Sequence, residues 1–513
     1  MMSTAARVMI PKAVRAMQKT ISAALVLLFF FSLTACAGSK NEDGRSETGI
    51  EDLLAEELRG EITVSCFNIV HYERFLSEAA ARFENAFPGT RINILTFSSM
   101  PETTDVDLGG GRIGGVTEQL DRQEESDYIS GINAQLIGGR GPDILAMDVL
   151  PCHRYADAGL LEDLRVFMDA DENFHMNAYR RNIFESTRYK GGQYFLPLDF
   201  DFRYVVFDKD KLSAETALVL RSKDKFTYPE LIGLIREQFA ADGSDARVID
   251  LGGDEARAFR TIWQLDYNKY VDLTDKNVHF TDSGFAGMLL EFDRQRRSGY
   301  FQPVFATLAE EVQDSMDNQD LYYFQYQPAY YLKLMFIPTD GGYRRDWPAH
   351  PDPDEIAGLL TNEDGGAVFR SFQSYAINAN SQNKALAWAF LKFMLSEEMQ
   401  QSTDLLGLPV NNAAFTDRAG LGLVRMPNYV FGEGDSYTME GFLENPDEKY
   451  IEAYQDYLSR LNVFVDALDE YSVADETISR MITDEAALFF NGSKSAEDVA
   501  AVLQNKVRLY LDE

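Results

Sequence analysis

Hydrophobic and polar positions alternate along the chain in patterns that predict strands and helices in turn from about residue 60 onward. Residues 61–70 form an apolar, β-rich run with the length of a buried parallel strand. In residues 71–89 the apolar positions recur every three to four residues, which predicts one buried helix face that Pro88 and Gly89 end. Residues 90–97 again predict a strand. A strand, a helix and a strand in this order predict an α/β fold.

Later segments continue this alternation. The helix predicted near residue 390 carries one continuous apolar stripe at i, i+3, i+4, i+7 and i+8, namely Leu386, Ala389, Phe390, Phe393 and Met394. The predicted elements are, in order, a helix end, a turn and a strand at 132–148, a turn and one long strand at 189–212, the start of a helix at 226–235, a strand, turn and helix at 371–400, and a closing helix at 495–513 that Ser495 would cap.

Residues 98–127 interrupt the pattern because they are polar and rich in glycine. They contain Gly109-x-Gly111-x-x-Gly114, which is the spacing of a dinucleotide-binding fingerprint. That fingerprint requires an apolar strand before it and a buried helix after it, and the flanking sequence predicts neither. We therefore predict a mobile surface loop here and no nucleotide site.

The first 35 residues have the character of a targeting segment. Four basic residues precede an apolar run, residues 21–33, which is too short to span a bilayer well. Its end, Leu33-Thr34-Ala35-Cys36, resembles a bacterial lipobox, which implies cleavage before Cys36 and acyl chains on that residue. The alternatives are an ordinary signal peptide or an uncleaved anchor with an incidental cysteine. Cys36 to residue 60 would then tether the body of the protein to the membrane.

Charge and cysteine content restrict the classes of partner. The net charge is −34, and removal of residues 1–35 would make it −38, a surface that repels nucleic acid and anionic lipid headgroups. No second apolar run approaches membrane length, which predicts a soluble body. Cys66 and Cys152 are the cysteines that follow Cys36; they could pair, but we favour buried free thiols.

Several segments, taken in order, resemble the extracellular solute-binding proteins of ABC importers, the large family that includes maltose-binding protein. The resemblance runs with gaps from about residue 60 onward, and it implies a monomeric binding protein without a cofactor, held on the outer face of the bacterial cytoplasmic membrane and partnered by an ABC permease. The segments are FENAFPG, GPDILAMD, YADAGLLEDL, YKGGQYFLPLDFDFRYVVFDKD, the stretch 270–292, YAINANSQNKALAWAFLKFMLSEEMQ and GLPVN.

The resemblance also implies a fold of two α/β lobes with a central ligand cleft, the periplasmic-binding-protein fold, in which the chain crosses three times between the lobes. The crossings would lie at 197–207, near 371–377 and near 408–411. The first lobe would comprise residues 61–200 and 372–408, and the second lobe residues 201–371 and 409–513.

The first crossing carries the most informative candidate site. Asp199, Asp201 and Arg203 alternate with phenylalanines, so that at a period of two the three charges share one face of a strand. Such a face requires either solvent or a ligand rich in hydroxyl groups, to which charged groups make strong hydrogen bonds. By resemblance, Asp201 corresponds to an acidic position that contacts sugar. The alternative interpretation is a hinge held by salt bridges.

Further candidates lie in loops beyond the carboxyl ends of predicted strands, where open α/β sheets bind ligands, and in a tyrosine-rich segment, 320–336. The resemblance puts a stacking aromatic residue of the second lobe in that segment, and aromatic faces pack on the C–H groups of sugar rings. Each of these residues could equally be an exposed loop residue or part of the core. The candidates are Asn68, His71, Asp148, Tyr323, Tyr326 and Trp347.

The function predicted from these features is capture of a solute, by resemblance and aromatic content a sugar or oligosaccharide. One alternative is a secreted glycosidase that uses two carboxylates. No histidine pair with metal-ligand spacing, HExxH or GxSxG occurs in the sequence, so we expect no metal site. A third interpretation is a sensor lipoprotein of the same fold. A neighbouring permease gene would favour import, a neighbouring histidine kinase gene would favour sensing, and released products would favour an enzyme.

Overall fold

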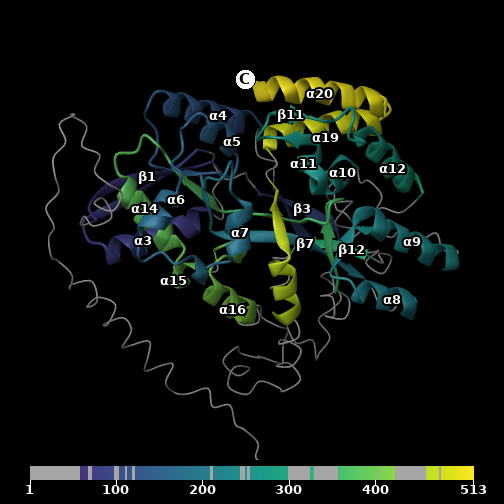
Figure 1. Ribbon diagram of the computed structural model, residues 1–513, viewed down its shortest axis with the longest axis horizontal. Coiled ribbons are helices and arrows are strands. Elements are labelled where there is room, and N and C mark those ends of the chain that lie inside the picture. The colour runs from purple at the N-terminus through teal and green to yellow at the C-terminus, as the bar shows by residue number, and fades with distance from the viewer. Residues whose placement is uncertain are drawn as a thin grey trace, which may run out of the picture. The chain divides into compact units, whose positions relative to one another are not determined.

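The computed structural model of this chain is drawn in Figure 1. The described residues are 58–67, 72–97, 103–109, 112–117, 122–207, 212–242, 249–250, 255–298, 324–328, 356–402, 404–421, 458–472 and 475–512.

The first sheet has five strands in the order β2-β1-β5-β15-β6. Strand β1 pairs in parallel with β2 and β5, while β15 runs antiparallel to β5 and β6. The strand, helix and strand predicted between residues 61 and 97 are confirmed as β1, α3 and β2, with slightly shorter bounds. The bounds are β1 Gly60–Cys66, α3 Tyr72–Ala86, β2 Thr90–Thr96, β5 Ile144–Ala146, β6 Leu196–Pro197 and β15 Ser374–Ile377.

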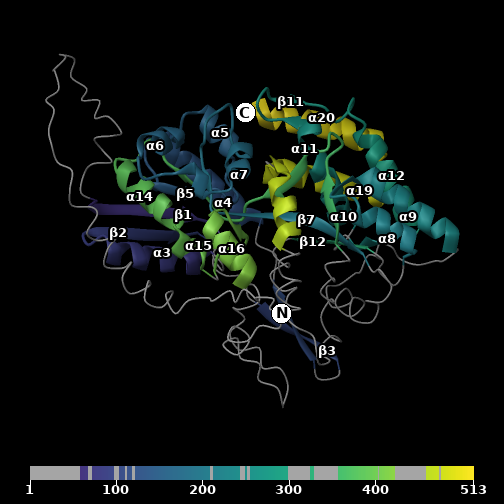
Figure 2. The same cartoon turned by 60° about the horizontal axis from the view of Figure 1, so that its bottom comes forward.

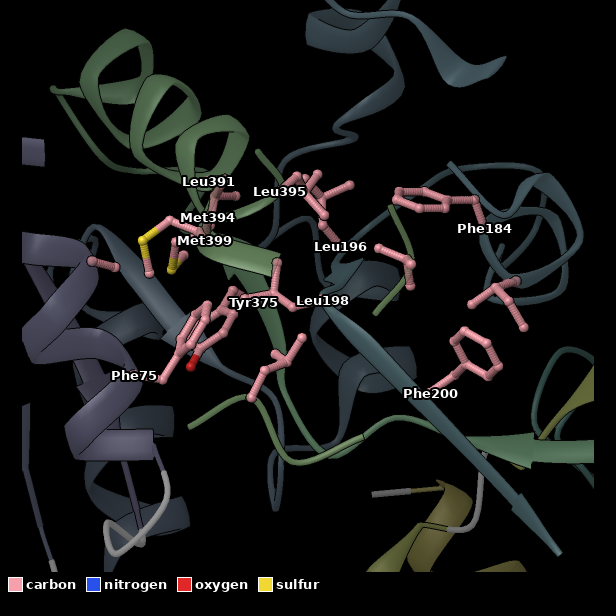
Figure 3. Close-up of a cluster of buried hydrophobic side chains, with 14 of the residues drawn as sticks. Phe75, Phe184, Leu196, Leu198, Phe200, Tyr375, Leu391, Met394, Leu395 and Met399 are labelled. Atoms are coloured by element: carbon pink, nitrogen blue, oxygen red, sulfur yellow. The ribbon is translucent and has the colours of Figure 1, made fainter. Parts of the chain in front are cut away.

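The core of this first part joins the sheet to helices α3 and α14 (Lys384–Met394). The predicted stripe on α14 is confirmed: Leu386, Phe390 and Met394 are buried, and the other two stripe residues pack partly buried against the same core. The helix buries three more residues than the stripe predicted, because other elements cover its remaining faces. Figure 3 shows how side chains from α3, α14, β15 and the stretch 196–200 gather in this core.

The second sheet has eight strands, of which six follow the order β17-β14-β13-β7-β12-β9. The central strand β7 pairs antiparallel with β12, β13 and β14, and also with the short strand β16; β8 pairs with β13. The bounds are β7 Asp199–Phe207, β8 Lys225–Thr227, β9 Ile249–Asp250, β12 Phe324–Pro328, β13 Ile356–Thr361, β14 Ala367–Arg370, β16 Leu408–Pro409 and β17 Leu468–Tyr471.

Helices α19 and α20 pack against α10 and α12 beside the second sheet (Figures 1 and 2). The predicted closing helix is α20, and the Ser495 hydroxyl accepts a hydrogen bond from the Asp498 N–H at 3.1 Å, as a cap does. The remaining helices are α4 Arg122–Ile137, α5 Cys152–Asp157, α6 Arg165–Ala170, α7 Arg181–Ser186, α8 Ala214–Arg221, α9 Tyr228–Asp242, α10 Glu255–Trp263, α11 Tyr267–Tyr270, α12 Phe285–Arg297, α15 Glu397–Gln400, α16 Asn412–Leu421, α19 Glu476–Phe490 and α20 Ala496–Asp512.

The prediction of a loop over residues 98–127 was wrong. This stretch contains an antiparallel hairpin, β3 (Thr103–Gly109) and β4 (Arg112–Thr117), and its last residues already belong to α4. The glycines obscured the alternation of polar and apolar positions that predicts a strand. Gly109 and Gly114 of the fingerprint lie within the two hairpin strands, not in a turn between a strand and a helix.

Three chain passages connect the first sheet with the second. The first passes directly from β6 into β7, and the second passes from β14 back to β15 through residues 371–373. The third leaves α14 and α15 and enters β16, where Leu408 pairs with Phe200 of β7. Three crossings predicted from the sequence are therefore confirmed. Since β7 also pairs with β14, all three passages lie next to one another.

The Asp199 side chain links these three passages. It is fully buried at the start of β7, and its Oδ1 accepts hydrogen bonds from the Phe372 N–H (2.8 Å) and the Gln373 N–H (3.0 Å) of the second passage. The Ser371 hydroxyl lies 3.1 Å from the same oxygen. Oδ2 accepts from the Gly407 N–H of the third passage at 2.7 Å. One carboxylate therefore holds all three passages together.

Gly407 is required for this close approach. A Cβ atom there would lie 2.7 Å from the Phe200 carbonyl oxygen and 2.9 Å from the Asp199 carboxylate. Burial raises the pKa of Asp199, while its hydrogen-bond donors oppose that shift by stabilising the ionised form. The donors also supply the hydrogen bonds that water would otherwise give to a buried carboxylate, so its burial is tolerated only in this arrangement.

We predict that Phe390→Ala lowers the free energy of unfolding by about 3–5 kcal/mol, because it removes a fully buried aromatic side chain and leaves a cavity. Phe390 packs edge-on against Phe83 with ring centroids 5.3 Å apart. Urea denaturation measures the change. As a control, Leu509→Ala on α20, where the side chain is 62% exposed, should change stability by less than about 0.5 kcal/mol. Equal effects of the two substitutions would contradict this description of the core.

We predict that Asp199→Asn weakens the third passage selectively. An amide can keep one oxygen toward residues 372 and 373, but its NH₂ group then faces the Gly407 N–H, and an unsatisfied buried donor costs about 1–3 kcal/mol. Amide hydrogen exchange should therefore become faster at the Gly407 N–H, whereas the N–H groups of residues 372 and 373 should remain protected.

The matched control for this substitution is Asp171→Asn. Asp171 is another buried carboxylate, and it accepts hydrogen bonds from Trp388 Nε1 (2.9 Å) and Lys392 Nζ (2.5 Å), away from the passages. Asp171→Asn should reduce stability without faster exchange at Gly407. If Asp199→Asn leaves exchange at Gly407 unchanged, Asp199 does not hold the third passage.

Candidate functional site

Asp201 forms an ion pair with Arg370 where the first two passages meet. The Arg370 Nε and Nη2 atoms donate to Asp201 Oδ2 at 3.2 and 3.1 Å, and the two residues are direct neighbours in the pairing of β7 with β14. Asp201 is fully buried, whereas the Arg370 side chain is 46% exposed and its guanidinium lies 4.4 Å over the Phe372 ring. The site therefore presents an oriented cation to its surroundings, with the carboxylate behind it.

The three charges on β7 differ from the sequence interpretation in their exposure. Both carboxylates are fully buried, and Arg203 is partly buried. For Asp199 we withdraw the expectation of a ligand contact, because donors from within the chain occupy both of its oxygens. For Asp201, the ion-paired hinge that the sequence left as an alternative is present. Arg203 lies on the same strand, where it pairs with Pro328 of β12.

A pocket of about 170 Å³ opens at the carboxyl ends of β1 and β2. The polar groups that line the pocket include the Ser65 hydroxyl, which lies 3.2 Å from the Tyr128 hydroxyl of α4. Leu95 and Phe97 also line it and remain about half exposed. The sequence placed ligand-binding residues beyond the ends of these same strands. The lining residues are Ser65, Leu95, Thr96, Phe97, Tyr128, Gly131, Ile132, Gln135 and Pro142.

Aromatic rings surround one side of this pocket. Phe67, Phe97 and Tyr128 lie with ring centroids 5.4–6.4 Å apart in each of their three pairs. These distances are typical of favourable aromatic contacts. A partly exposed ring edge beside paired hydroxyl groups can pack on the apolar faces of a ligand while hydrogen bonding to its polar groups.

Asp148, on the turn after β5, lies within electrostatic reach of this cluster. Burial raises the pKa of Tyr128 and of Tyr375, and in both cases the charge of Asp148 raises it further. The charge of Asp199 acts on Tyr375 in the same direction. The charges of Asp148 and Asp199 therefore both act on Tyr375 of β15. Asp148 itself is partly buried.

Cys66 and Cys152 are both free thiols, as the sequence predicted; Cys66 is buried, whereas Cys152 is partly buried. Burial raises the pKa of each thiol to about 12, and Asp148 and Glu73 add to the effect at Cys66. Thiols with such a raised pKa stay protonated at neutral pH and are poor nucleophiles.

The other candidates fall wholly or partly outside the described residues. Tyr326 belongs to β12, where it pairs with Val205 of β7, but its side chain is not described. Asn68, His71, Tyr323, Trp347 and Cys36 lie outside the described residues.

Sequence reasoning missed Arg370, Phe97 and Tyr128. Arg370 carries a local signal, since it directly precedes the second predicted passage in AVFRSFQSY, but only the pairing of β14 with β7 shows which carboxylate it meets. Tyr128 had no such signal, because it falls just after the stretch that was interpreted as a loop. Its contact with Ser65 spans 63 residues of sequence.

Neither a metal site nor a membrane span is found in the described part of the chain. Within those ranges, no set of three or more histidine, cysteine or acidic side chains is placed to hold a metal ion. No helix among the described residues combines the length and the apolar character needed to cross a bilayer.

Several solved structures are similar to this chain throughout its fold. An extracellular solute-binding protein of family 1 from Alicyclobacillus acidocaldarius has a TM-score of 0.56 and 13% identity, covering 89% of this chain and 100% of its own. The sugar-binding protein MalE from Xanthomonas citri also has a TM-score of 0.56, with 15% identity over 88% and 98% of the two chains. Maltose-bound MalE3 of T. maritima has a TM-score of 0.52 and 17% identity, over 88% and 99%.

These similarities confirm the two-lobed periplasmic-binding-protein fold that the sequence indicated. At such low identity they establish the fold alone. A family model adds evidence from the sequence itself: the model described as bacterial extracellular solute-binding protein matches residues 112–401, more than half of the chain. The chain therefore belongs to the bacterial extracellular solute-binding protein family.

Proposed function

We propose that this protein captures a carbohydrate outside the bacterial cytoplasmic membrane, closes its two lobes around it and delivers it to an ABC permease. The observation that carries this proposal is the Asp201–Arg370 pair at the meeting point of the passages. A half-exposed guanidinium held by a buried carboxylate is a fixed donor for hydroxyl groups, and charge-assisted hydrogen bonds are the strong ones. Its position at the hinge would link ligand contact to lobe closure.

Similar structures support carbohydrate as the ligand class. Among them are a maltose-bound protein, the GacH receptor of Streptomyces glaucescens described in complex with acarbose, and a Listeria monocytogenes protein in complex with cycloalternan. The aromatic cluster beside Ser65 and Tyr128 provides, in this chain, apolar ring faces next to hydroxyl groups. Sugars need this combination, since their rings carry C–H faces and hydroxyl edges.

The ligand site in this proposal comprises Asp201 with Arg370, Asp148 and the pocket beside Tyr128. The tyrosines Tyr323 and Tyr326 would supply the second-lobe wall by resemblance. The remaining candidates, Arg203, Asn68, His71 and Trp347, are assigned to the proposed ligand site from their sequence positions alone. Lobe boundaries at residues 200–201, 371–372 and 408–409 belong to the same proposal.

The described hinge geometry disfavours a glycosidase. That chemistry needs one carboxylate as acid or base and another as base or nucleophile, both accessible to the substrate. Of the pair on β7, Asp199 is fully buried and engaged by main-chain donors, and Asp201 is fully buried and ion-paired. The binding role is therefore proposed without catalytic activity. A sensor of the same fold would bind the same ligand, and the genomic neighbours described above would distinguish it.

The ligand class is tested by a thermal-shift screen of the purified chain. A ligand that binds only the folded state raises the melting temperature, by an amount that grows with its concentration over Kd. We expect oligosaccharides such as maltose to raise it, and we expect peptides and polyamines to leave it unchanged. A response to peptides or polyamines alone would refute the carbohydrate assignment. Products released from an incubated oligosaccharide, detected by chromatography, would refute the non-catalytic role.

We predict that Asp201→Asn and Tyr323→Ala each weaken binding of the sugar found in the screen by about ten- to a hundredfold, which corresponds to about 1.4–2.8 kcal/mol. The first loses a charge that orients Arg370, and the second loses a stacked ring. Titration calorimetry measures both. The control is Asp293→Asn on α12. This carboxylate also pairs with arginines, Arg296 and Arg297, but it is remote in sequence from the three passages, so the variant should keep the wild-type affinity. Wild-type affinity in both site variants would contradict the site.

We predict that Cys36→Ser prevents attachment to the membrane. If Cys36 is the acylated residue, its loss removes the thiol that carries the diacylglycerol group, and two or three acyl chains are what stable anchoring requires. Cells grown with labelled fatty acid should label the wild type and the Cys66→Ser control, and they should not label Cys36→Ser. Label retained by Cys36→Ser would show that the anchor lies elsewhere.

A further inference from the structure

The two lobes also meet away from the passages, at residues that are remote from them in sequence. We call the first lobe the first sheet with its helices, and the second lobe the second sheet with its helices. Helix α5 of the first lobe lies beside the start of α19 and the end of α20, both of the second lobe (Figures 1 and 2). This contact joins residues 153–154 to residues 475–510, and no covalent passage between the sheets lies in it.

Asp475 is the centre of this contact. It caps α19, because its Oδ1 accepts hydrogen bonds from the Thr477 N–H (2.9 Å) and the Ile478 N–H (3.1 Å). Its Oδ2 accepts from the Tyr510 hydroxyl at 2.9 Å. The Nε2 atom of His153 lies 3.8 Å from that same Oδ2, and only 5% and 3% of the two side chains is exposed. The carboxylate is thus held by hydrogen bonds from the second lobe, and His153 of the first lobe lies against it.

Further contacts between the lobes flank this centre. The Arg154 guanidinium lies 4.9 Å over the Tyr510 ring. Glu125 of α4 pairs with Arg480 of α19, and just 12% and 24% of these side chains is exposed. The Tyr189 hydroxyl lies 3.2 Å from the Leu273 carbonyl oxygen, beyond β10 (Val271–Asp272). Charges shielded from water in this way attract each other more strongly than exposed ones do.

His153 is the component that can change its charge in the physiological range. Its Nε2 has no hydrogen-bond partner among the described residues, and 3.8 Å to Asp475 is too long for a hydrogen bond. Burial lowers the pKa of His153; Asp475 and Asp157 act against this, and Arg154 and Lys276 act with it. The charged and titratable groups around it are Asp475 at the start of α19, Tyr510 of α20, Lys276 of the turn after β10, and Arg154 and Asp157 of its own helix.

We propose that α5 and the start of α19 form a latch that holds the two lobes closed without ligand, and that protonation of His153 releases it. Neutral His153 fits the buried contact. A protonated imidazole would be charged and desolvated, and among the described residues no acceptor lies within hydrogen-bond distance of its Nε2, because the Asp475 carboxylate attracts it only across 3.8 Å. Once the lobes separate, water solvates the same cation. This inference rests on the proposed lobe closure, and it concerns the regulation of that closure.

The direction of the pH effect follows from proton linkage. The closed form lowers the pKa of His153, so the open form binds the proton more readily. Closure is therefore fully supported above the ordinary histidine pKa of about 6.5 and is lost progressively as the pH falls below it. Each unit by which closure lowers this pKa makes closure about tenfold less favourable at acid pH. A ligand that needs the closed form would bind more weakly there.

Small-angle scattering of the full ligand-free chain tests the latch. We would compare the radius of gyration at about pH 7.5 and about pH 5.5, on either side of an ordinary histidine pKa. We expect the wild type to expand on acidification and His153→Gln, which cannot be protonated, to keep the smaller radius. The matched control is His279→Gln: this histidine is exposed and pairs with Asp282 within its own lobe, so the variant should expand as the wild type does.

A second variant tests closure independently of protonation. Arg480→Gln removes the ion pair with Glu125 and should enlarge the radius of gyration already at about pH 7.5. Because this pH lies above the ordinary histidine pKa of about 6.5, protonation of histidine does not account for that expansion. The proposal is overturned if the wild type and His153→Gln respond identically to pH, if the wild type contracts on acidification, or if Arg480→Gln keeps the wild-type radius. Because ligand is absent throughout, these outcomes are separate from those of the sugar screen, whose failure would leave the scattering result intact.

Discussion

The constraint on which the rest of this structure depends is the burial of one carboxylate, Asp199, where the chain crosses between its sheets. A buried anion is tolerated only when donors replace water, and these donors are main-chain N–H groups of residues 372, 373 and 407. The arrangement therefore fixes three passages that the sequence separates by about two hundred residues. It also requires a glycine at 407, since any Cβ there would collide with β7.

The same constraint defines what a ligand can meet. Because β7 is held at Asp199, Asp201 two residues later is fixed against Arg370, and the guanidinium is the member of that pair that remains half exposed. Preorganised donors bind without the cost of ordering flexible side chains. The hinge thus combines two tasks in three residues of one strand: Asp199 carries the mechanical connection, and Asp201 orients the polar contact.

Much of the fold was predictable from the sequence because its signals are local. The apolar period of α3 and the stripe of α14 follow from helix geometry, and the burial of Phe83 and Phe390 agrees with both. The hairpin at β3 and β4 was missed because glycines remove side chains from the very positions that would show alternation. Elements whose buried face shows as an apolar periodicity in the sequence were therefore predicted, whereas a hairpin formed mainly by main-chain pairing was not.

The site was less predictable, because its contacts depend on which distant segments meet. Spacing along β7 correctly grouped Asp199 with Asp201 but could not separate their roles, since that depends on donors at residues 371–373 and 407. His153 illustrates the same limit: in the sequence it is one histidine in a loop, and its meaning comes from Asp475, more than three hundred residues away. Hinge and latch thus hold the same two lobes by opposite means. The hinge uses a buried charge that accepts hydrogen bonds from within the chain, and the latch uses a buried imidazole whose Nε2 has no hydrogen-bond partner among the described residues. Opening would therefore give that nitrogen a hydrogen bond with water.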